Sequence, residues 1–371
     1  MSRIVIVGAQ PRSMINFRGE LIRTLVGAGH AVTAMTGPAT NEERSAIEAF
    51  GANFRPFPIQ RNGLNPLRDL RALYALRKAF RDLQPAIVVA YTIKPIIWGG
   101  IALRGLKNVR FFALITGLGF AFQGGSVARR MLTHLVTNLY RTALRRAQCV
   151  IFQNRDDKAL FAAGGIVNPA SCGLVNGSGV DLDRFAAVPV PFDGAVFLTV
   201  ARLLGAKGLR EFAAAAREVK TRYPHAEFRL LGPPDPSPDG IPLREVQEWH
   251  DNGWIRYLGA ADDVRPFLAS CSVFVFPSYH EGMPRAVLEA LAVGRPILTT
   301  DVPGCRETVI EEENGRLVPK ADAAALANRV VWFIENREAW ERMGARSRML
   351  AEERFDVRCV NREIMRLMNL N

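Results

Sequence analysis

Short apolar runs alternate with longer amphipathic stretches along this chain, and the alternation starts twice. The first series opens at RIVIVGA (residues 3–9) and the second at AVFLTVAR (residues 195–202). Strands that alternate with helices build a parallel sheet covered by helices on both faces. A stretch rich in Gly, Pro and Asp, residues 175–194, separates the two series, as a linker between two cores would. The sequence therefore predicts an α/β protein with two doubly wound, Rossmann-like domains facing across a cleft.

The chain length of 371 residues is consistent with two domains of about 100–200 residues each. We place the N-terminal domain at residues 1–175 and the C-terminal domain at residues 176–354. A C-terminal helix at about residues 355–371 is expected to pack back on the N-terminal domain. The other helices and strands that the argument uses are expected at residues 19–28, 66–83, 126–147 and 209–222 (helices) and at residues 86–92, 110–116, 227–232, 272–278 and 296–301 (strands).

The net charge of +12 is concentrated in the first half of the chain. Residues 1–170 hold 23 basic and 8 acidic side chains, a net charge of +15, whereas residues 171–371 have a net charge of −3. No acidic residue lies between Asp82 and Asp156. Such a field attracts anionic membrane surfaces, polyphosphates or nucleic acid. A solvated basic face that only aids solubility is the alternative interpretation.

The five cysteines are widely spaced and form no Cys-x-x-Cys or Cys/His pattern, so neither a disulfide framework nor a zinc site is predicted. The first residues run straight into a strand and lack the apolar core and the cleavage site of a signal peptide. No stretch approaches the roughly 20 apolar residues that span a bilayer. We therefore expect a protein of the reducing cytoplasm.

Two glutamates lie around the start of a helix that is expected after the strand ending in FPS. Glu281 lies in the turn before this helix, and Glu289 lies inside it. Pro284 suits the first helical turn, and the amides of Gly282, Met283 and the residues that follow carry the positive end of the helix dipole toward an anion. The carboxylate of Glu289 can accept two hydrogen bonds from a ribose-like diol. The two glutamates can therefore hold the two ends of an elongated ligand whose phosphates lie between them.

A pair of cations follows the strand at residues 195–202. Arg202 and Lys207 lie on either side of a glycine in the loop before the next helix. Because ligands of open α/β sheets bind at the carboxyl ends of the strands, both cations can converge on one diphosphate there. The alternative is a basic loop that binds no ligand.

The second half of the chain resembles the family-4 retaining glycosyltransferases of the two-Rossmann-domain GT-B class. The matching segments are RLLGAKG, LGAADDV, FPSYHEGMPRAVLEALAVGRPILTTDVPGCRETV and NGRLVP. Enzymes of this class need no metal, so the resemblance implies that neither a metal nor a cofactor is used. The resemblance implies a donor site made of Arg202 and Lys207 for the diphosphate, Glu281 with the backbone of Gly282, Met283 and Pro284 for the transferred sugar, Glu289 for the ribose, and Gly232 at a strand end. Arg202, Lys207 and Glu281 are the residues that it implies to be catalytic.

The first half narrows the resemblance to enzymes that add N-acetylgalactosamine or a related hexose to a sugar on undecaprenyl diphosphate. Undecaprenyl-diphosphate-linked bacillosamine is an example of such an acceptor. The matching segments are SMINFRG, YTIKP, TGLGFAF, FQNRDD and NGSGVDL. Many family members carry a paired glycine and a histidine where this chain has GAQPRSMIN and ITGLG, so no residue is assigned to orient the acceptor hydroxyl. The candidate acceptor-binding residues are Asn16, Arg18, Lys94, Thr116 and Gly117.

The resemblance implies transfer of a hexose or N-acetylhexosamine, with N-acetylgalactosamine as the first expectation, from a UDP-sugar to a polyprenyl-diphosphate-linked sugar during assembly of bacterial surface or glycoprotein glycans. No residue stands out as a covalent nucleophile, which favours retention by front-face attack, with the leaving phosphate helping to accept the proton of the acceptor. The expected partners are the UDP-sugar, the lipid-linked acceptor and an anionic membrane surface, without nucleic acid. The expected location is the inner face of the cytoplasmic membrane, bound peripherally.

Two of the expected helices, residues 66–83 and 126–147, place apolar side chains at helical spacing with arginines between them. Packing of the apolar stripes against the sheet is the simpler interpretation. Docking of the basic faces on a membrane surface is the second one.

Three other functions are open from the sequence alone. A non-hydrolysing UDP-N-acetylglucosamine 2-epimerase shares the two-domain architecture and forms an epimer without an acceptor. A dinucleotide oxidoreductase would require Gly-x-Gly-x-x-Gly after the first strand, where this chain has GAQPRS. A non-catalytic basic module that binds lipid headgroups or nucleic acid would account for the charge but would leave Glu281 and Glu289 without a role.

Overall fold

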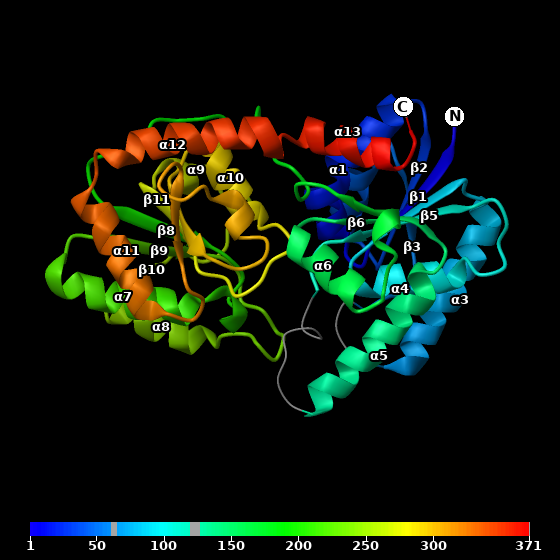
Figure 1. The fold of residues 1–371 in the computed structure, drawn as a ribbon, viewed down its shortest axis with the longest axis horizontal. Coiled ribbons are helices and arrows are strands. Elements are labelled where there is room, and N and C mark those ends of the chain that lie inside the picture. The colour runs from blue at the N-terminus through cyan, green and yellow to red at the C-terminus, as the bar shows by residue number, and fades with distance from the viewer. Residues whose placement is uncertain (61–64, 119–126, 371) are drawn as a thin grey trace. The chain divides into compact units, whose positions relative to one another are not determined.

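The computed structural model describes residues 1–60, 65–118 and 127–370 (Figure 1). The chain divides into two compact units, which we call unit 1 (Met1–Ser178 with Val360–Asn371) and unit 2 (Gly179–Cys359). Each unit contains one parallel sheet. The linker composition predicts a division between residues 175 and 176, and the chain passes from unit 1 to unit 2 after Ser178. Within the described ranges, no helix is long and apolar enough to cross a membrane.

Unit 1 holds a seven-stranded sheet in the order β3-β2-β1-β4-β5-β6-β7, and all neighbouring strands run parallel. A parallel sheet that is covered on both faces needs strands that are apolar throughout, and all five residues of β4 are buried. The strands span Arg3–Val7 (β1), Ala31–Thr36 (β2), Asn53–Pro56 (β3), Ile87–Tyr91 (β4), Arg110–Ile115 (β5), Ala147–Phe152 (β6) and Cys172–Leu174 (β7).

Helices cover both faces of this sheet. Because successive strand residues point to opposite faces, Val5 and Val7 join one core with α3, α4, α5 and α6, while Ile4 and Ile6 join the other with α1, α2 and α13. The chain thus returns to unit 1 through α13. The helices span Pro11–Gly27 (α1), Asn41–Glu48 (α2), Pro66–Leu83 (α3), Ile93–Ala102 (α4), Val127–Leu144 (α5), Arg155–Ala163 (α6) and Val357–Leu367 (α13).

Helix α3 confirms the prediction for residues 66–83, and its ends have clear local causes. The side chain of Asn65 accepts hydrogen bonds from two amides of the first turn, at 3.1 and 3.3 Å. Pro66 follows at the first helical position, where its missing N–H is not needed. The chain leaves the helix at Gln84, whose φ of 44° is left-handed.

Two other predicted helices differ from the observed ones at their ends. The prediction of residues 19–28 is wrong at its start, because Pro11 already occupies the first turn of α1. Helix α5 ends at Leu144, since Ala147 begins the buried strand β6. The predicted start of that helix at Ser126 lies outside the described residues.

Unit 2 holds a six-stranded parallel sheet in the order β10-β9-β8-β11-β12-β13. Its strands span Val196–Val200 (β8), Glu227–Leu231 (β9), Arg256–Tyr257 (β10), Val273–Phe276 (β11), Ile297–Thr300 (β12) and Gly315–Val318 (β13). Its helices span Leu209–Arg222 (α7), Leu243–Asp251 (α8), Arg265–Ala269 (α9), Arg285–Val293 (α10), Ala323–Glu335 (α11) and Ala339–Leu350 (α12). Two buried clusters form its core, one containing α7 and α11 and the other containing α10.

Both sheets reverse their strand order beside their first strand. In unit 1, β1 lies between β2 and β4, and in unit 2, β8 lies between β9 and β11. Ligands of open α/β sheets bind beyond the carboxyl ends of the strands at such a reversal. The segments that contain Arg202, Lys207 and Glu281 follow β8 and β11, so the fold brings them to one edge of the sheet. The architecture confirms the predicted α/β class with two Rossmann-like parallel sheets.

Candidate functional site

The loop between β8 and α7 packs against the end of β11. Tyr279 donates its amide to the carbonyl of Ala206 at 2.9 Å, and the Ser278 hydroxyl oxygen lies 3.2 Å from the same carbonyl oxygen. Gly208 has a left-handed φ of 67°, and a Cβ added there would lie 2.0 Å from the carbonyl oxygen of Pro277. Only glycine permits this approach. The packing fixes Lys207, which directly precedes Gly208, beside the end of β11.

Lys207 and Glu281 form an ion pair although 74 residues separate them in the sequence. Nζ of Lys207 contacts Oε1 of Glu281, and the Ser278 hydroxyl donates to that same oxygen at 2.6 Å. Only 19% and 16% of the two charged side chains are exposed. Nζ of Lys207 also lies 5.4 Å from the ring centroid of Phe276. The sequence predicts both residues for the site, and the structure brings them together in a half-buried cluster with Ser278.

Arg202 contacts an acidic side chain that the sequence did not point to. Nη1 of Arg202 pairs with Oδ2 of Asp235, whose side chain is 7% exposed. The amide of Ser237 donates to the other carboxylate oxygen of Asp235 at 3.0 Å. Burial acts to raise the pKa of Asp235, but the hydrogen bonds from Ser237 and the charge of Arg202 outweigh it and lower that pKa below its ordinary value.

The loop at residues 232–240 supports the site. Asp239 accepts a hydrogen bond from the amide of Ala206 at 2.9 Å, and its carbonyl accepts one from the amide of Gly205, also at 2.9 Å. No sequence signal identifies Asp235 and Asp239, because their partners lie more than thirty positions away in the chain. The two aspartates hold the loop that carries Arg202 and Lys207.

Gly232 lies at the end of β9, where the backbone of β8 passes closely. A Cβ at this position would lie 1.8 Å from the carbonyl oxygen of Ala201. The amide of Gly232 donates to Gly259 at 2.7 Å, and its carbonyl accepts from the Tyr257 hydroxyl at 2.9 Å. Close packing therefore requires a glycine here, and a contact of Gly232 with the donor stays a prediction.

Helix α10 starts at Arg285, and Pro284 occupies the N-cap position directly before it. Glu289 lies in the second turn of this helix with its side chain 13% exposed, and the Arg285 guanidinium donates to it at 2.8 Å. Burial raises the pKa of Glu289, and the nearby charge of Arg285 only partly opposes this. Gly282 and Met283 lie in the turn between Glu281 and the helix, as predicted from the sequence.

Tyr279 adds a polar contact that the sequence did not predict. Its hydroxyl donates to Glu211 of α7 at 2.7 Å. Burial, followed by this carboxylate, raises the pKa of Tyr279 above its usual range, so the phenol stays protonated at neutral pH. The hydrogen bond from Tyr279 to Glu211 ties the turn after β11 to helix α7. His280, which precedes Glu281, is half-buried.

The candidate acceptor residues of unit 1 lie around the end of its sheet at β1, β4 and β5. Arg18 of α1 is buried, with its guanidinium 5.0 Å from the ring centroid of Tyr91. Lys94, in the first turn of α4, donates to Asp69 of α3 at 2.8 Å, and each of these side chains is 15% exposed. Asn16 of α1 is exposed.

The two remaining candidates follow strand β5. Thr116 and Gly117 are half-buried, and β5 lies next to β4 in the sheet. Residues 119–122 of the predicted segment 116–122 lie outside the described residues. The strand order thus brings Lys94 and Thr116 to the same edge of the sheet, while a common ligand for them stays a prediction.

Comparisons with known proteins place both halves of the chain among sugar-transferring enzymes. Residues 15–172 match the family described as "Glycosyl transferase 4-like domain", and residues 194–336 match "Glycosyl transferases group 1". The N,N'-diacetylbacillosaminyl-diphospho-undecaprenol alpha-1,3-N-acetylgalactosaminyltransferase of Campylobacter jejuni is 26% identical over 88% of each chain. An Escherichia coli UDP-Gal:alpha-D-GlcNAc-diphosphoundecaprenol alpha-1,3-galactosyltransferase is also 26% identical, over 81% of this chain and 79% of its own.

Solved structures of similar fold cover the whole chain. A sucrose-phosphate synthase from Thermosynechococcus elongatus superposes with a TM-score of 0.82 at 21% identity, over 100% of this chain and 98% of its own. Anabaena Alr3699/HepE in complex with UDP-glucose superposes with a TM-score of 0.80 at 17% identity, over 100% of both chains. At these identities the likeness establishes the fold.

Proposed function

Because the chain belongs to the glycosyltransferases, we propose that it transfers a hexose or an N-acetylhexosamine from a UDP-sugar to an undecaprenyl-diphosphate-linked sugar, with retention of configuration. A glycosyl transferase 4-like domain is followed in the chain by a group 1 domain. N-acetylgalactosamine is the first expectation for the transferred sugar. The enzyme is a hexosyltransferase. The observation that carries the proposal is the cluster of Lys207, Glu281 and Ser278 at the strand-order reversal of unit 2. The names of the two curated relatives above, both of which act on sugars linked to undecaprenyl diphosphate, support the acceptor class.

The donor is assigned to unit 2. Arg202 and Lys207 take the diphosphate, the turn of Glu281 to Pro284 takes the transferred sugar, and Glu289 takes the ribose. The positive end of α10 adds to the field that favours the phosphates. Asp235 and Glu281 hold the two cations in place, so the diphosphate meets a site whose charges are already positioned.

Transfer breaks the bond between the anomeric carbon and the β-phosphate oxygen and forms a bond from the same carbon to the acceptor hydroxyl. The proton of that hydroxyl passes to the departing phosphate oxygen. Arg202 and Lys207 stabilise the negative charge that develops on the leaving diphosphate, which is the main electrostatic demand of the step. Both new and old bonds lie on one face of the sugar, which gives retention without a covalent enzyme intermediate.

The acceptor is assigned to unit 1. Lys94 and Arg18 supply positive charge near the ends of β4 and β1, and Asn16, Thr116 and Gly117 supply polar groups at the same end of the sheet. The acid-free stretch between Asp82 and Asp156 makes this unit attractive to an anionic acceptor. The positive charge of unit 1 would attract both the diphosphate of a lipid-linked acceptor and the membrane that carries it, because both are anionic.

The test is a transfer assay with a panel of UDP-hexoses and UDP-N-acetylhexosamines and with short-chain polyprenyl-diphosphate sugars as acceptors. Mass spectrometry follows the lipid-linked product, and NMR assigns the configuration of the new linkage. A product that is longer by one α-linked sugar supports the proposal. Epimerised UDP-sugar in the absence of acceptor would instead identify a 2-epimerase, and the absence of turnover with every donor would leave a non-catalytic binding module.

A further inference from the structure

Helix α3 exposes large apolar side chains on the face that points away from its core. Leu67, Leu70 and Tyr74 are 70%, 57% and 72% exposed, and their spacing of three and four residues puts them on one stripe. The opposite stripe, which includes Leu76 and Phe80, is fully buried against the sheet. Packing inside unit 1 therefore accounts for one side of α3 and leaves the other unexplained.

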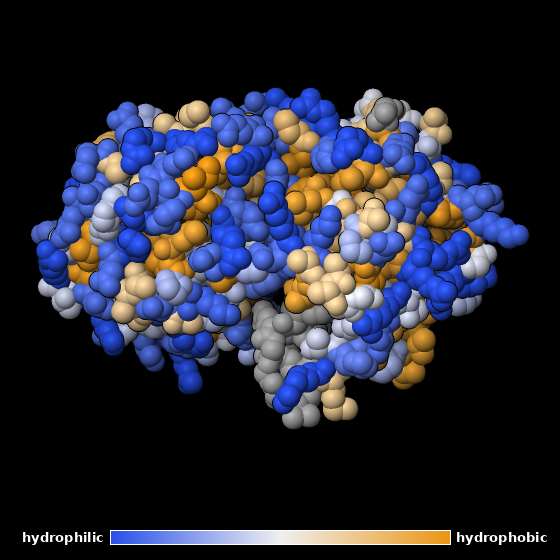
Figure 2. All heavy atoms as spheres, viewed as in Figure 1, coloured by the Kyte–Doolittle hydropathy of each residue, from blue (hydrophilic) through white to orange (hydrophobic). Residues whose placement is uncertain are grey.

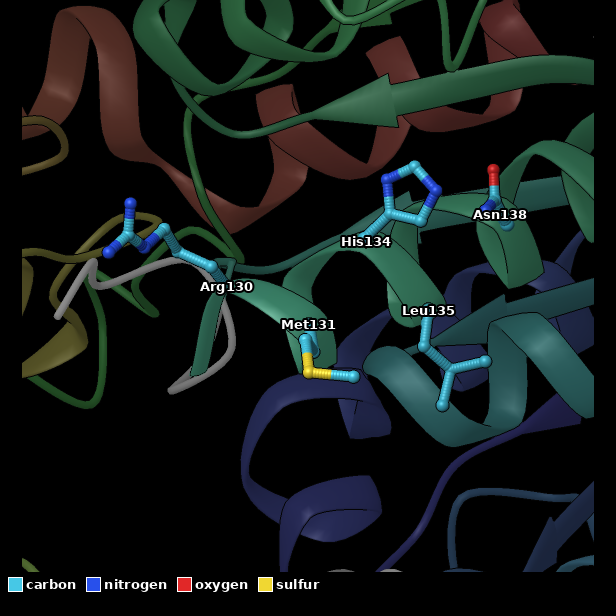
Figure 3. A pocket seen from close by; sticks show the side chains of 5 residues that line it. All are labelled: Arg130, Met131, His134, Leu135 and Asn138. Carbon is cyan, nitrogen blue, oxygen red and sulfur yellow. The ribbon is translucent and has the colours of Figure 1, made fainter. Parts of the chain in front are cut away.

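Helix α5 repeats this arrangement. Met131 and Leu135 are 70% and 55% exposed, whereas Val136 and Tyr140 of the same helix are buried. Figure 3 shows the side chains of Met131 and Leu135 pointing to the same side of the helix. A hollow of about 580 Å³ runs along this stretch, lined by Arg130, Met131, His134, Leu135 and Asn138.

The two helices belong to one layer of unit 1. Both contact α4, which lies between them, and all three join the same core cluster on one face of the sheet (Figure 1). Large exposed apolar residues are ordinary when they are single, but five on two helices of one layer mark an interaction surface. Figure 2 shows apolar atoms reaching the surface of unit 1 beside hydrophilic ones. We call this surface the α3–α5 face, defined by Leu67, Leu70, Tyr74, Met131 and Leu135.

Basic side chains surround these apolar residues. Helix α3 carries exposed Arg68, Arg71, Lys78 and Arg81, and α5 carries exposed Arg130 and Arg141. The acidic residues of α3 are engaged elsewhere, since Asp69 pairs with Lys94 and Asp82 pairs with Arg55. Helix α5 contains no acidic residue. The face therefore combines apolar side chains with an excess of positive charge.

We propose that the α3–α5 face docks on the surface of an anionic lipid bilayer, with its apolar side chains in the headgroup boundary and its basic side chains on the lipid phosphates. This partner fits both features of the face. A nucleic acid would use the charges and leave the apolar residues in water, and a second copy of the chain would bring two strongly positive units together. The inference rests on the proposed function for its consequence, which is that docking brings the enzyme to a lipid-linked acceptor.

The docking test uses the full chain and vesicles of phosphatidylcholine with or without about 30% phosphatidylglycerol. The wild type is expected to float with anionic vesicles, to lose binding in high salt and to ignore neutral vesicles. Leu70→Glu with Leu135→Glu is expected to weaken anionic vesicle binding about tenfold or more. The matched control is Leu243→Glu with Met349→Glu, which changes two comparably exposed apolar residues of unit 2.

A second variant, Arg68→Ala with Arg71→Ala and Lys78→Ala, removes charge without adding any and is expected to reduce the salt-sensitive part of the binding. Circular dichroism and thermal unfolding verify that each variant is folded. Vesicle binding by both variants that equals the wild type would overturn the proposal. A shift from dimer to monomer in light scattering, without loss of vesicle binding, would also overturn it, by showing that the face joins two copies.

Transfer assays separate this inference from the proposed function. With a water-soluble short-chain acceptor, the Leu70→Glu/Leu135→Glu variant is expected to match the wild type, and with an undecaprenyl acceptor in anionic vesicles it is expected to fall about tenfold. Equal transfer by the variant and the wild type on vesicles would contradict docking. Failure of the wild type with the short-chain acceptor would contradict the proposed function alone, because vesicle flotation does not depend on turnover.

Discussion

The carboxyl ends of the strands are built differently in the two units, although both sheets reverse their order in the same way. In unit 2, each cation after β8 has an acidic partner from another loop, Asp235 for Arg202 and Glu281 for Lys207. The charges of these two ion pairs balance each other, and hydrogen bonds from Ser237 and Ser278, each in the same loop as its acidic partner, hold Asp235 and Glu281. An anion that binds here exchanges one set of ion pairs for another.

In unit 1, positive charge exceeds negative charge. Buried Arg18 lies against the ring of Tyr91, and Lys94 has Asp69 as its acidic partner. Residues 1–170 carry a net charge of +15. A shared topology therefore sets where a ligand can bind, whereas the placement of acidic residues decides whether the cations there are already paired or attract anions broadly. Four predictions test this contrast, in order of decreasing effect.

The largest effect is expected for Lys207→Ala. The substitution removes a charge that faces the leaving diphosphate, and loss of one such group typically lowers kcat by about 10²–10³-fold. Steady-state kinetics with saturating donor and acceptor measure the effect. Lys220→Ala is the control, because this lysine of α7 donates to the surface carbonyl of Gly253 at 2.7 Å and is not assigned to the diphosphate. A Lys207→Ala enzyme with kcat near the wild-type value would remove unit 2 from the proposed chemistry.

The second prediction compares glycines at corresponding strand ends. Gly208→Ala in unit 2 combines a left-handed φ with a Cβ 2.0 Å from the Pro277 backbone, and we expect a loss of about 3 kcal/mol or more in the free energy of unfolding. In Gly8→Ala of unit 1, the atoms nearest to the new Cβ all belong to the Tyr91 side chain, the hydroxyl oxygen at 2.2 Å, Cζ at 2.4 Å and Cε1 at 2.7 Å. Because a side chain shifts more readily than backbone, the expected cost is about 1–2 kcal/mol. Urea unfolding of both variants provides the comparison, and equal losses would show that the two edges are packed alike.

The helices and strands differ in how well they could be predicted from the sequence. The predictions for residues 66–83 and 209–222 are confirmed as α3 and α7, because strong periodicity and clear end signals act locally. The short strand β13, Gly315–Val318, was not predicted, since four residues carry too little pattern to distinguish a strand from a loop. The start of α1 at Pro11 was not predicted, because the buried positions of its first half include Arg18 and Gly19, which interrupt the apolar helical pattern.

The candidate site was predicted as a set of residues but not as a set of contacts. Lys207 and Glu281 follow strands that become neighbours only in the folded sheet, so no local pattern could pair them. Asp235 and Asp239 were missed for a related reason, because a proline-rich loop shows no period and its partners are distant in sequence. Residue type and strand position predict which chemistry gathers at an edge, whereas the partners of each charge depend on the tertiary fold.

The third prediction concerns Glu289→Gln. If Glu289 holds the ribose, the amide of the variant offers one acceptor fewer, and the KM for the UDP-sugar rises about tenfold with a smaller change in kcat.

The same substitution also affects stability. Because burial raises the folded-state pKa of Glu289 above its unfolded value, the wild-type residue loses stabilising free energy as the pH rises through that pKa. The variant is therefore expected to be at least as stable as the wild type at pH 7, with the difference vanishing below about pH 4. Thermal unfolding across this pH range and donor kinetics measure the two effects separately, and an unchanged KM would exclude the ribose contact.

The smallest effect is expected where the balance of charge in unit 1 is altered by one group. Asp69→Asn removes the acidic partner of Lys94 and leaves the lysine charge available to the acceptor diphosphate, so the acceptor KM is expected to fall about two- to threefold while the donor KM stays the same. Asp82→Asn is the matched control on the same helix, because it releases the more exposed Arg55. An equal change in both variants would mean that the acceptor responds to the net charge of unit 1 and not to Lys94, whereas a change confined to Asp69→Asn would assign the acceptor diphosphate to the end of β4.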